Sequence, residues 1–475
     1  MKKKQIISLV LASLMSVSLL AGCGADKDTS DSGKKVLKIW SFTDEVRTMT
    51  LAYEEANPDV KVEYTMIPMT NGEFQTKLKS ALQTGDVPDV ISLEASFVRE
   101  YVESDYLADL GDLLPKAEEL GTYQFTIDEG TYEGVTKAFS YQATPGAFFY
   151  RRSLAKEYFG TDDPAEIQEI VGDMDKFEAA AAVVKEKSNG DTFMVGSTGD
   201  FTNLFFSNRT DPWIVDDKLV IDPKIDDLFE IAKTFREKGY EAQAAQWAEG
   251  WFAGMNDSLV DAAGDPKQVF SYFLPTWGLP YVLMSNSAPK KAKDADGNET
   301  DTLVGKDTAG DWACINGPMP YQWGGTWIGV AKDSKNIELA KEFVEFATLN
   351  EDTLANWATG VYTNEYLKNI DDSIGDKLGQ GAGDFVSSKK VVEKIMPKFD
   401  DSETTKFLAG QNSYSGFAEA APFVSLELLQ ASDDAIQRSL NDPLANYVTG
   451  DATKDEAMTQ FKEAVRNEFP EVTVE

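Results

Sequence analysis

The sequence predicts an α/β fold with at least two lobes, and three observations lead to this expectation. Apolar strand patterns alternate with amphipathic helix patterns over residues 36–93. Another strand followed directly by a helix pattern returns over residues 326–347. Residues 36–475, with a hydrophobic content of 42% over the whole chain, exceed what one hydrophobic core usually serves.

The first of these regions reads as strand, helix, strand, helix, strand. The expected strands are Val36–Trp40, Val60–Met66 and Val90–Leu93. A helix pattern over Val46–Ala56 ends at Asn57-Pro58, and a second one places Phe74, Leu78, Ala81 and Leu82 on one face. This order predicts right-handed crossovers and a parallel sheet with helices packed on it.

Later segments break the rhythm of the first lobe. Phe139–Tyr150 holds Pro145-Gly146 inside an aromatic run, which indicates a crossing point between lobes. The chain is helix-rich from Leu154, and residues 288–311 indicate an exposed excursion. A strand is expected at Thr326–Ala331, and the tail from about Asp372 is mostly helical.

The N-terminus has the layout of a secretory leader. Three lysines precede the apolar run Ile6–Leu20, which is short for a membrane-spanning helix. Leu20–Cys23 resembles the bacterial lipobox, which implies cleavage after residue 22 and a lipid on Cys23. Residues 24–35 are polar and form the expected flexible tether. The mature protein is therefore expected to be exported and lipid-anchored to the outer face of a bacterial cell membrane. The alternative is an ordinary cleaved signal that ends near a cysteine.

Charge and composition exclude several classes of function. The net charge is −35, which repels phosphate backbones and argues against nucleic-acid binding. There is no histidine, so the commonest general base and the commonest transition-metal ligand are missing. With Cys314 as the only cysteine besides Cys23, no intrachain disulfide framework is expected. Composition therefore disfavours most enzymes.

Cofactor motifs are not convincing. Asp294–Asn298 weakly resembles a calcium loop, but Glu299 stands at the sixth position and Gly305 at the twelfth. No GxxxxGK[ST] phosphate loop occurs. We expect neither a metal nor a cofactor.

Six segments in order resemble the extracellular solute-binding proteins of ABC sugar importers (family 1), the family of maltose-binding protein. These segments are Ile39–Glu45, Tyr53–Tyr64, Thr84–Glu94, Gly146–Leu154, Leu274–Pro280 and Trp323–Phe346. The resemblance implies a two-lobed periplasmic-binding-protein-like fold of type 2. In such a fold each lobe is an α/β sheet built from discontinuous segments, and a hinge joins the lobes around a central cleft. The implied N-terminal lobe is 36–144 plus 325–370, and the C-terminal lobe is 145–324 plus 371–475.

A sugar needs flat aromatic surfaces for its C–H faces and polar groups for its hydroxyl rim. Trp277 and Trp323 are the leading stacking candidates, because each lies in a loop rich in Pro or Gly and the family places cleft aromatics in these motifs. Trp251, Trp213 and Phe97 are weaker candidates. The alternative for each is packing at the edge of a core.

The polar candidates follow the predicted strands. Asp44 and Glu45 follow the first strand and Glu94 the third, although each could be a solvated charge or a helix N-cap. Asp44 matches a cleft aspartate of maltose-binding protein, whereas Glu45 departs from its lysine and argues against a maltodextrin ligand. Further cleft candidates are Tyr141, Gln142, Asn203 and Asn256. Gly324 and Gly325 are expected to let the backbone approach the ligand, with a plain tight turn as the alternative.

The resemblance implies a non-enzymatic, monomeric receptor. It would capture a mono- or oligosaccharide and deliver it to the permease subunits of an ABC importer. The alternatives are a surface glycoside hydrolase, since carboxylates and aromatic clefts also suit glycosidases, and an adhesive carbohydrate-binding lipoprotein.

Overall fold

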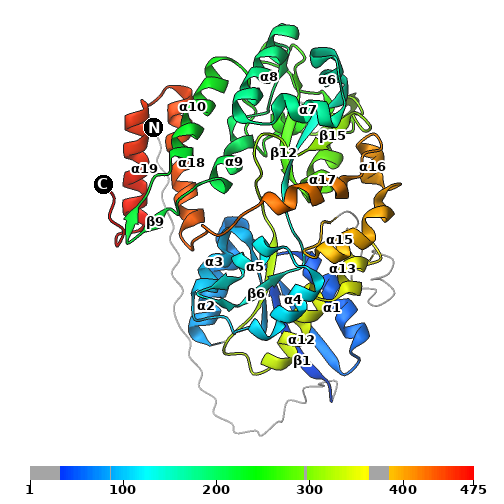
Figure 1. Cartoon of the computed structure of the whole chain (residues 1–475), viewed down its shortest axis with the longest axis vertical. Helices are drawn as coiled ribbons and strands as arrows, with labels where there is room; N and C mark the ends of the chain where they lie inside the picture. The colour runs from blue at the N-terminus through cyan, green and yellow to red at the C-terminus, as the bar shows by residue number, and fades with distance from the viewer. Residues whose placement is uncertain (1–32, 86, 294–296, 363–383) are drawn as a thin grey trace, which may run out of the picture.

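The chain forms two lobes, each built around its own β-sheet (Figure 1). The computed structural model describes residues 33–85, 87–293, 297–362 and 384–475. The predicted leader and Cys23, part of the weak calcium motif at 294–296 and the start of the tail at 363–383 lie outside the described residues. No helix in the described part is long and apolar enough to cross a bilayer.

The first lobe contains a five-stranded sheet in the order β2-β1-β3-β16-β6. Its strands are β1 (Lys35–Ser41), β2 (Val60–Met66), β3 (Val90–Glu94), β6 (Ala138–Ser140) and β16 (Thr326–Val330). β1 pairs in parallel with β2 and β3, as the sequence predicted. β16 enters from the other direction and runs antiparallel to β3 and β6.

Helices cover both faces of this sheet. They are α1 (Asp44–Ala56), α2 (Glu73–Thr84), α3 (Ala95–Glu103), α4 (Leu114–Leu120), α5 (Gln124–Glu129), α12 (Ile337–Thr348) and α13 (Glu351–Ala358). Leu37 and Ile39 of β1 pack in one core with Phe343 of α12. Leu93 of β3 packs in a separate core with Phe74 of α2. The predicted helix faces are thus confirmed, and Thr43 caps α1 by accepting a bond from the Glu45 N–H.

The second lobe surrounds a three-stranded antiparallel sheet in the order β12-β7-β15. Its strands are β7 (Gly146–Arg151), β12 (Ser271–Pro275) and β15 (Trp312–Ile315). The aromatic run of β7 alternates between faces, since Phe148 packs against Phe177 and Phe149 against Phe417. Both faces of the strand are buried.

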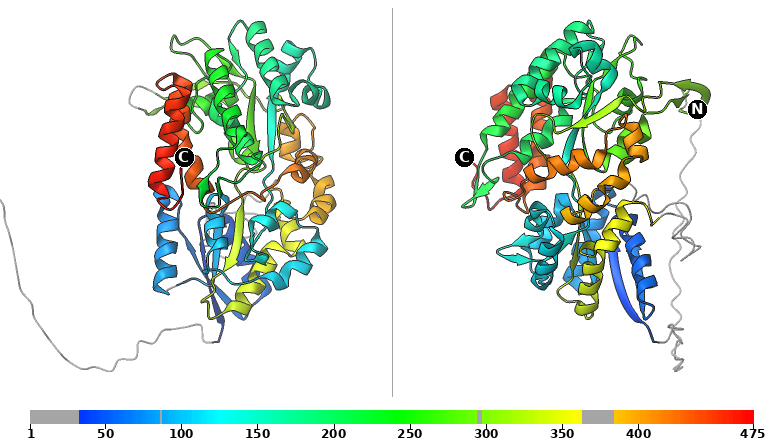
Figure 2. Two further views of the ribbon diagram at one scale, coloured as in Figure 1. Left: turned by 60° about the vertical axis from the view of Figure 1, so that its left-hand side comes forward. Right: turned by 45° about the vertical axis from the view of Figure 1, so that its right-hand side comes forward.

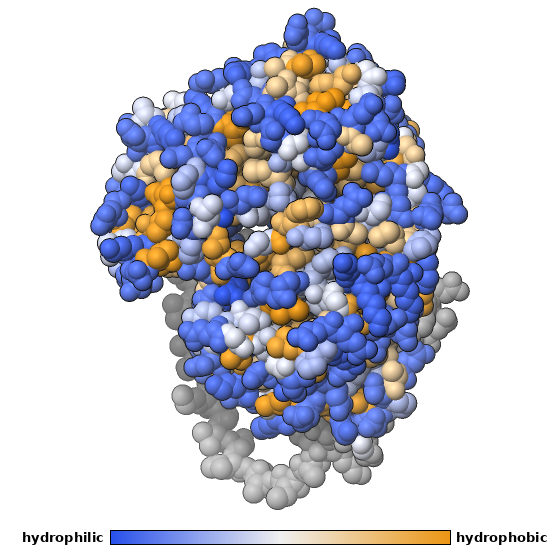
Figure 3. All heavy atoms as spheres, in the orientation of Figure 1, coloured by the Kyte–Doolittle hydropathy of each residue, from blue (hydrophilic) through white to orange (hydrophobic). Residues whose placement is uncertain are grey.

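The helices of the second lobe lie around this sheet (Figures 1 and 2). They are α6 (Arg152–Phe159), α7 (Pro164–Val171), α8 (Met174–Lys187), α9 (Thr202–Ser207), α10 (Pro223–Glu237), α11 (Glu249–Ala253), α16 (Glu403–Phe407), α17 (Ser413–Ala420), α18 (Asp433–Thr449) and α19 (Lys454–Glu468). In the predicted excursion, β13 (Lys290–Lys293) and β14 (Glu299–Val304) form an antiparallel hairpin, and β14 is mostly exposed. The face of the molecule seen in Figure 3 is mostly hydrophilic.

The chain crosses between the sheets twice in its first 330 residues. It leaves the first sheet after Ser140 and enters the second at Gly146, then returns between Ile315 and Thr326. The tail contacts both lobes: α15 (Lys389–Ile395) packs on α4 and α13, whereas α18 packs on α10. The lobe division given above, which assigns the whole tail to the second lobe, stays a prediction.

Candidate functional site

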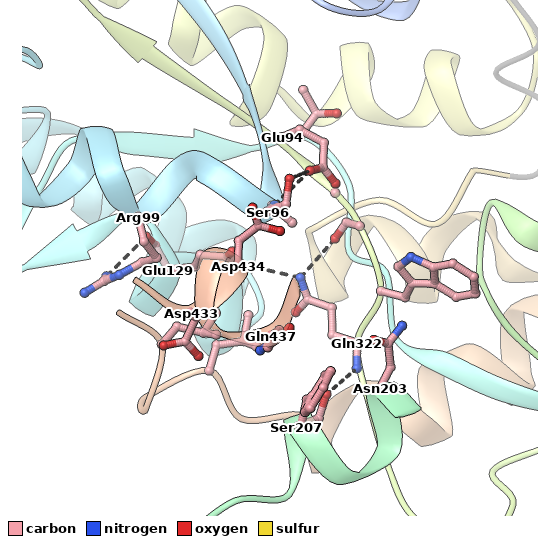
Figure 4. Close-up of a pocket in the computed structure, with 18 of the residues that line it drawn as sticks. Glu94, Ser96, Arg99, Glu129, Asn203, Ser207, Gln322, Asp433, Asp434 and Gln437 are labelled. Carbon is pink, nitrogen blue, oxygen red and sulfur yellow. Dashed lines mark hydrogen bonds between the residues drawn. The ribbon is translucent and has the colours of Figure 1, made fainter. Parts of the chain in front are cut away.

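A cavity of about 690 Å³ lies where the two lobes meet. The loop after β1 and the start of α3 after β3 line it from the first lobe, so the carboxyl ends of two parallel strands open onto it. α9, the loop after β12 and the chain before and within α18 line it from the second lobe. The returning segment Gln322–Thr326 also lines it, and Figure 4 shows Gln322 among the lining side chains.

Two indoles form what we call the aromatic wall, Trp277 and Trp323. Both line the cavity and are partly buried. Their ring centroids lie 5.5 Å apart at 69°, an edge-to-face contact. The Trp277 Nε1–H donates to the backbone oxygen of Trp323 at 3.0 Å. This bond uses the one polar atom of the Trp277 ring internally and holds the ring in place.

Gly324 and Gly325 follow Trp323 directly and also line the cavity. Both have positive φ, at 77° and 123°. A Cβ at Gly324 would lie 2.8 Å from Nε1 of Trp277, and one at Gly325 would lie 2.7 Å from the Trp327 ring. The glycines are therefore needed to seat two indoles against the backbone, and the predicted close approach to a ligand stays a prediction.

A second group of lining residues carries carboxyl and amide side chains, and we call it the polar wall (Glu45, Glu94, Glu129 and Gln322). Gln322 Nε2 donates to Glu129 Oε2 at 3.4 Å and to the Gly324 oxygen at 3.1 Å. Glu129 is fully buried, and burial raises the pKa of its carboxyl well above the ordinary value, although Arg99 opposes the shift. The Oε1 atoms of Glu129 and Gln322 are buried and have no hydrogen-bond partner.

Glu94 ends β3 and caps α3. Its Oε2 accepts a bond from the Ser96 N–H at 2.8 Å and a shorter one from the Ser96 hydroxyl (Figure 4). Burial raises the pKa of its carboxyl, while the bonds from Ser96 lower it. The N-cap alternative for Glu94 is thus real, and the same carboxyl also lines the cavity.

Glu45 lies in the first turn of α1, and a second acid, Asp384, lies near it. Burial raises the pKa of its carboxyl to about 8, and the nearby Asp384 carboxylate adds to the shift. The Tyr141 hydroxyl donates to Glu45 Oε2 at 2.5 Å and partly opposes it. The pKa of Asp384 is also raised, to about 6, mainly by burial.

Two arginines line the cavity, and each is already engaged. Arg209 is ion-paired with Asp433, a buried pair, and burial still raises the pKa of that acid to about 6. Arg99 pairs with Glu103 at 3.1 Å and donates to the Thr131 oxygen at 2.7 Å. Neither guanidinium is left as an unpaired charge in the cavity.

Eight of the predicted site residues line this cavity together. They are Glu45, Glu94, Gln142, Asn203, Trp277, Trp323, Gly324 and Gly325. They come from segments up to 280 residues apart in the sequence, such as Glu45 and Gly325. The structure brings them to one surface, and their role in binding stays a proposal.

Three aromatic candidates lie elsewhere. Phe97 packs among Phe42, Phe74 and Tyr101 in the core beneath α3. Trp251 is fully buried and donates its Nε1–H to Asp200 Oδ1 at 2.7 Å. The weaker Trp213 is likewise fully buried. These rings are packed in cores, as the alternative interpretation expected, and none of them lines the cavity.

Three polar candidates also fail to line the cavity. Asp44 lies in the first turn of α1, one residue before Glu45, whose side chain does line the cavity. Tyr141 is fully buried and reaches the site only through its bond to Glu45. Asn256 is buried and donates to the Ala288 oxygen at 2.9 Å, so it holds the start of the excursion. Asp44 thus lies beside the cavity, Tyr141 holds the Glu45 carboxyl, and Asn256 holds a loop.

Sequence reasoning missed several lining residues. Arg99 and Glu129 lie on helices whose periodicity predicts only packing. Gln322 directly precedes the Trp323 motif, and this position in the sequence could have marked it as a candidate site residue. The stretch from Ser425 to Gln437 lines the cavity from the tail, and the Ala431 N–H donates to Glu103 of α3 at 3.1 Å. Nothing in the sequence of this stretch distinguishes it from an ordinary loop that leads into a helix.

Comparison with known proteins places this fold and cavity in a family. Residues 48–367 match the model of the bacterial extracellular solute-binding proteins, and the chain belongs to that family.

Two Bacillus subtilis (strain 168) proteins are partly similar in sequence. The arabinooligosaccharide-binding protein is 30% identical over 123 residues, which are 24% of this chain and 28% of that protein. The melibiose/raffinose/stachyose-binding protein MelE is 25% identical over 189 residues, which are 38% of this chain and 41% of that protein. The matches thus span less than half the length of these relatives.

A solved structure is similar over nearly the whole chain. It is the galacto-N-biose-/lacto-N-biose I-binding protein of the ABC transporter from Bifidobacterium longum, in complex with lacto-N-biose. The TM-score is 0.62 at 15% identity, covering 92% of this chain and 98% of that one. This likeness shows that the two chains share a fold.

Proposed function

We propose that this protein is a non-enzymatic carbohydrate receptor that holds a saccharide between its lobes. The observation that carries the proposal is the pairing of the two walls. The aromatic wall offers indole surfaces for C–H faces, and the polar wall offers carboxyl and amide oxygens for a hydroxyl rim. The similarity to three saccharide-binding proteins supports the same class of ligand.

The charges of the cavity favour an uncharged or amino saccharide over an acidic one. Five carboxyl groups line it, on Glu45, Glu94, Glu129, Asp433 and Asp434. The two arginines among the described lining residues are already ion-paired. A uronate or a phosphorylated sugar would bring a negative charge into a buried site whose arginines are already ion-paired, which is unfavourable at low dielectric.

The two unpartnered acceptors of the polar wall point to the same class. Glu129 Oε1 and Gln322 Oε1 are buried without a donor. Leaving a buried polar oxygen unsatisfied is costly, so a ligand whose hydroxyl groups reach these oxygens would be stabilised there, because a hydroxyl can both donate and accept. A hydroxyl-rich saccharide supplies such groups.

Delivery to a membrane importer is the second part of the proposal. The family resemblance and a relative that serves an ABC transporter support it. A lipid on Cys23 and the tether after it would hold the receptor close to the permease at the outer face of the membrane.

A carbohydrate panel tests the receptor function. Purified protein should show a thermal shift with at least one neutral oligosaccharide, such as the arabinooligosaccharides or the series melibiose, raffinose and stachyose. Chromatography after incubation should find the sugar uncleaved, and small-angle scattering should show a smaller radius of gyration with ligand bound. Cleavage would instead favour the hydrolase, and no binding across the panel would contradict the proposal.

The anchor is tested separately. Cys23→Ala should leave an unprocessed precursor or release the protein into the medium. Labelled palmitate that enters the variant and the natural chain equally would contradict lipidation at this residue.

A further inference from the structure

Trp247 is the one exposed tryptophan of the nine in this chain. It lies in the loop between α10 and α11, and 48% of its surface is accessible to solvent. The other eight indoles are buried or partly buried. Single exposed apolar side chains are common on protein surfaces, so the exposure of Trp247 matters here because its ring contacts both indoles of the aromatic wall.

The backbone at Trp247 adopts an uncommon conformation. Its φ is 69°, in the left-handed region that bulky residues rarely occupy. The residue is at the third position of a turn closed by the Ala248 N–H to the Ala245 oxygen at 2.9 Å. Strained positions of this kind persist where the surrounding structure holds them, and they cluster at binding sites.

The indole of Trp247 continues the aromatic wall outward. It lies parallel to Trp277, with ring centroids 6.3 Å apart and planes at 9°, and edge-on to Trp323 at 5.7 Å. Trp251 and Phe252 support it at 5.3 and 6.2 Å. Trp247 itself does not line the cavity, whereas Trp277 and Trp323 do. Three indoles thus form one surface that runs from inside the cavity to the solvent.

We propose that Trp247 is an outer stacking platform for a ring of an oligosaccharide that extends beyond the cavity. The inference rests on the proposed carbohydrate function and deepens it, since it assigns the receptor to oligosaccharides. Rings held inside the cavity contact Trp277 and Trp323, and the next ring along the chain stacks on the open face of Trp247. An indole with few rotatable bonds, held by its neighbours, loses little entropy when it binds such a ring.

Chain length is the variable that tests the platform. Affinities are measured by calorimetry for melibiose, raffinose and stachyose, and for arabinooligosaccharides of two to four units. In the series that binds, Trp247→Ala should weaken the longest member about tenfold and the shortest less than twofold. Trp247→Tyr should restore most of the lost affinity, because it keeps a ring that can stack.

Controls separate this platform from a general loss of structure. Tyr106→Ala removes an aromatic ring of 36% exposure beside Lys332, past the end of β16 that lies away from the cavity, and it should change affinity for no chain length. Trp247→Gly removes the indole and relieves the positive φ, and it should show the same length-dependent loss as Trp247→Ala. An equal loss for all lengths, or none for any, would overturn the platform and leave the receptor function intact. A natural chain that binds no carbohydrate would overturn both.

Discussion

The two walls of the cavity differ in how complete they are without a ligand. On the aromatic wall the Trp277 N–H is bonded to the Trp323 backbone, and the glycines that follow seat the rings. On the polar wall the Oε1 atoms of Glu129 and Gln322 are buried with no partner. One wall is therefore preorganised by packing, whereas the other is satisfied only when donors arrive.

This difference separates affinity from selectivity. A preorganised apolar surface stabilises many saccharides, because each has C–H faces to stack. Unsatisfied acceptors reward only ligands whose hydroxyl or amino groups reach them, and a missing donor leaves them unpaired. We expect the aromatic wall to carry most of the binding free energy and the polar wall to choose among sugars.

The largest expected effect is truncation of the aromatic wall. Trp277→Ala and Trp323→Ala should each weaken saccharide binding by about 2 kcal/mol, roughly thirtyfold, because a desolvated aromatic anchor is lost. Calorimetry measures the affinity and thermal denaturation the stability. Trp312→Phe, which alters a buried indole in the second sheet, should lower the melting temperature and leave affinity unchanged. If either cavity variant loses stability but keeps its affinity, that ring belongs to the core.

The polar wall should show a smaller effect. Glu129→Gln keeps the shape of the side chain but replaces one acceptor with a donor beside Gln322. We expect affinity to fall by about 1.5 kcal/mol, near tenfold, which is typical of a lost bond to an ionisable group. The exposed Glu119→Gln should have no effect. Full affinity in Glu129→Gln would show that the ligand does not use this acceptor.

The acids of the polar wall should also set how stability depends on pH. Glu45 has a pKa of about 8 in the folded protein against 4.5 ordinarily, so the folded state holds a proton that the unfolded state releases. The free energy of unfolding should therefore fall as pH rises from about 5 to about 8. Glu45→Gln should flatten that decline, as followed by denaturant unfolding at several pH values. An unchanged slope would mean that Glu45 is ionised in the fold.

Metal removal should have the smallest effect. Within the described residues no group of three or more His, Cys, Asp or Glu side chains is placed to hold a metal ion. We expect a chelator to change saccharide affinity by less than twofold. A loss above tenfold would mean that the carboxyl groups of the polar wall act through a bound ion.

Local patterns predicted the first lobe well. Val60–Met66 was predicted to its last residue, and the face of Phe74, Leu78, Ala81 and Leu82 is buried as expected. Such patterns reflect neighbours in the sequence, so they do not show strand direction. β16 follows β6 by more than 180 residues, and its antiparallel direction depends on how that long segment folds. The periodicity of the strand itself does not show this direction.

Site residues were predictable where a loop motif marked them. Trp277 and Trp323 stand beside Pro or Gly, and both line the cavity. Trp251 also lies near glycines, yet the core encloses it, because the position of a loop does not reveal which way its side chains point. Glu129 was missed because a fully buried acid at the end of a short helix looks like any surface charge in the sequence.

Because the chain has no histidine, few of its side chains titrate near neutral pH. Between pH 6 and 8 no imidazole titrates, and the acids with pKa values in or near this range include Glu45 at about 8, Asp200 at about 7, and Asp384 and Asp433 at about 6. Any ligand whose donors favour the ionised form of Glu45 would release a proton to the medium on binding. Titrations in buffers of different ionisation enthalpy would count that proton directly and trace it to a carboxyl group.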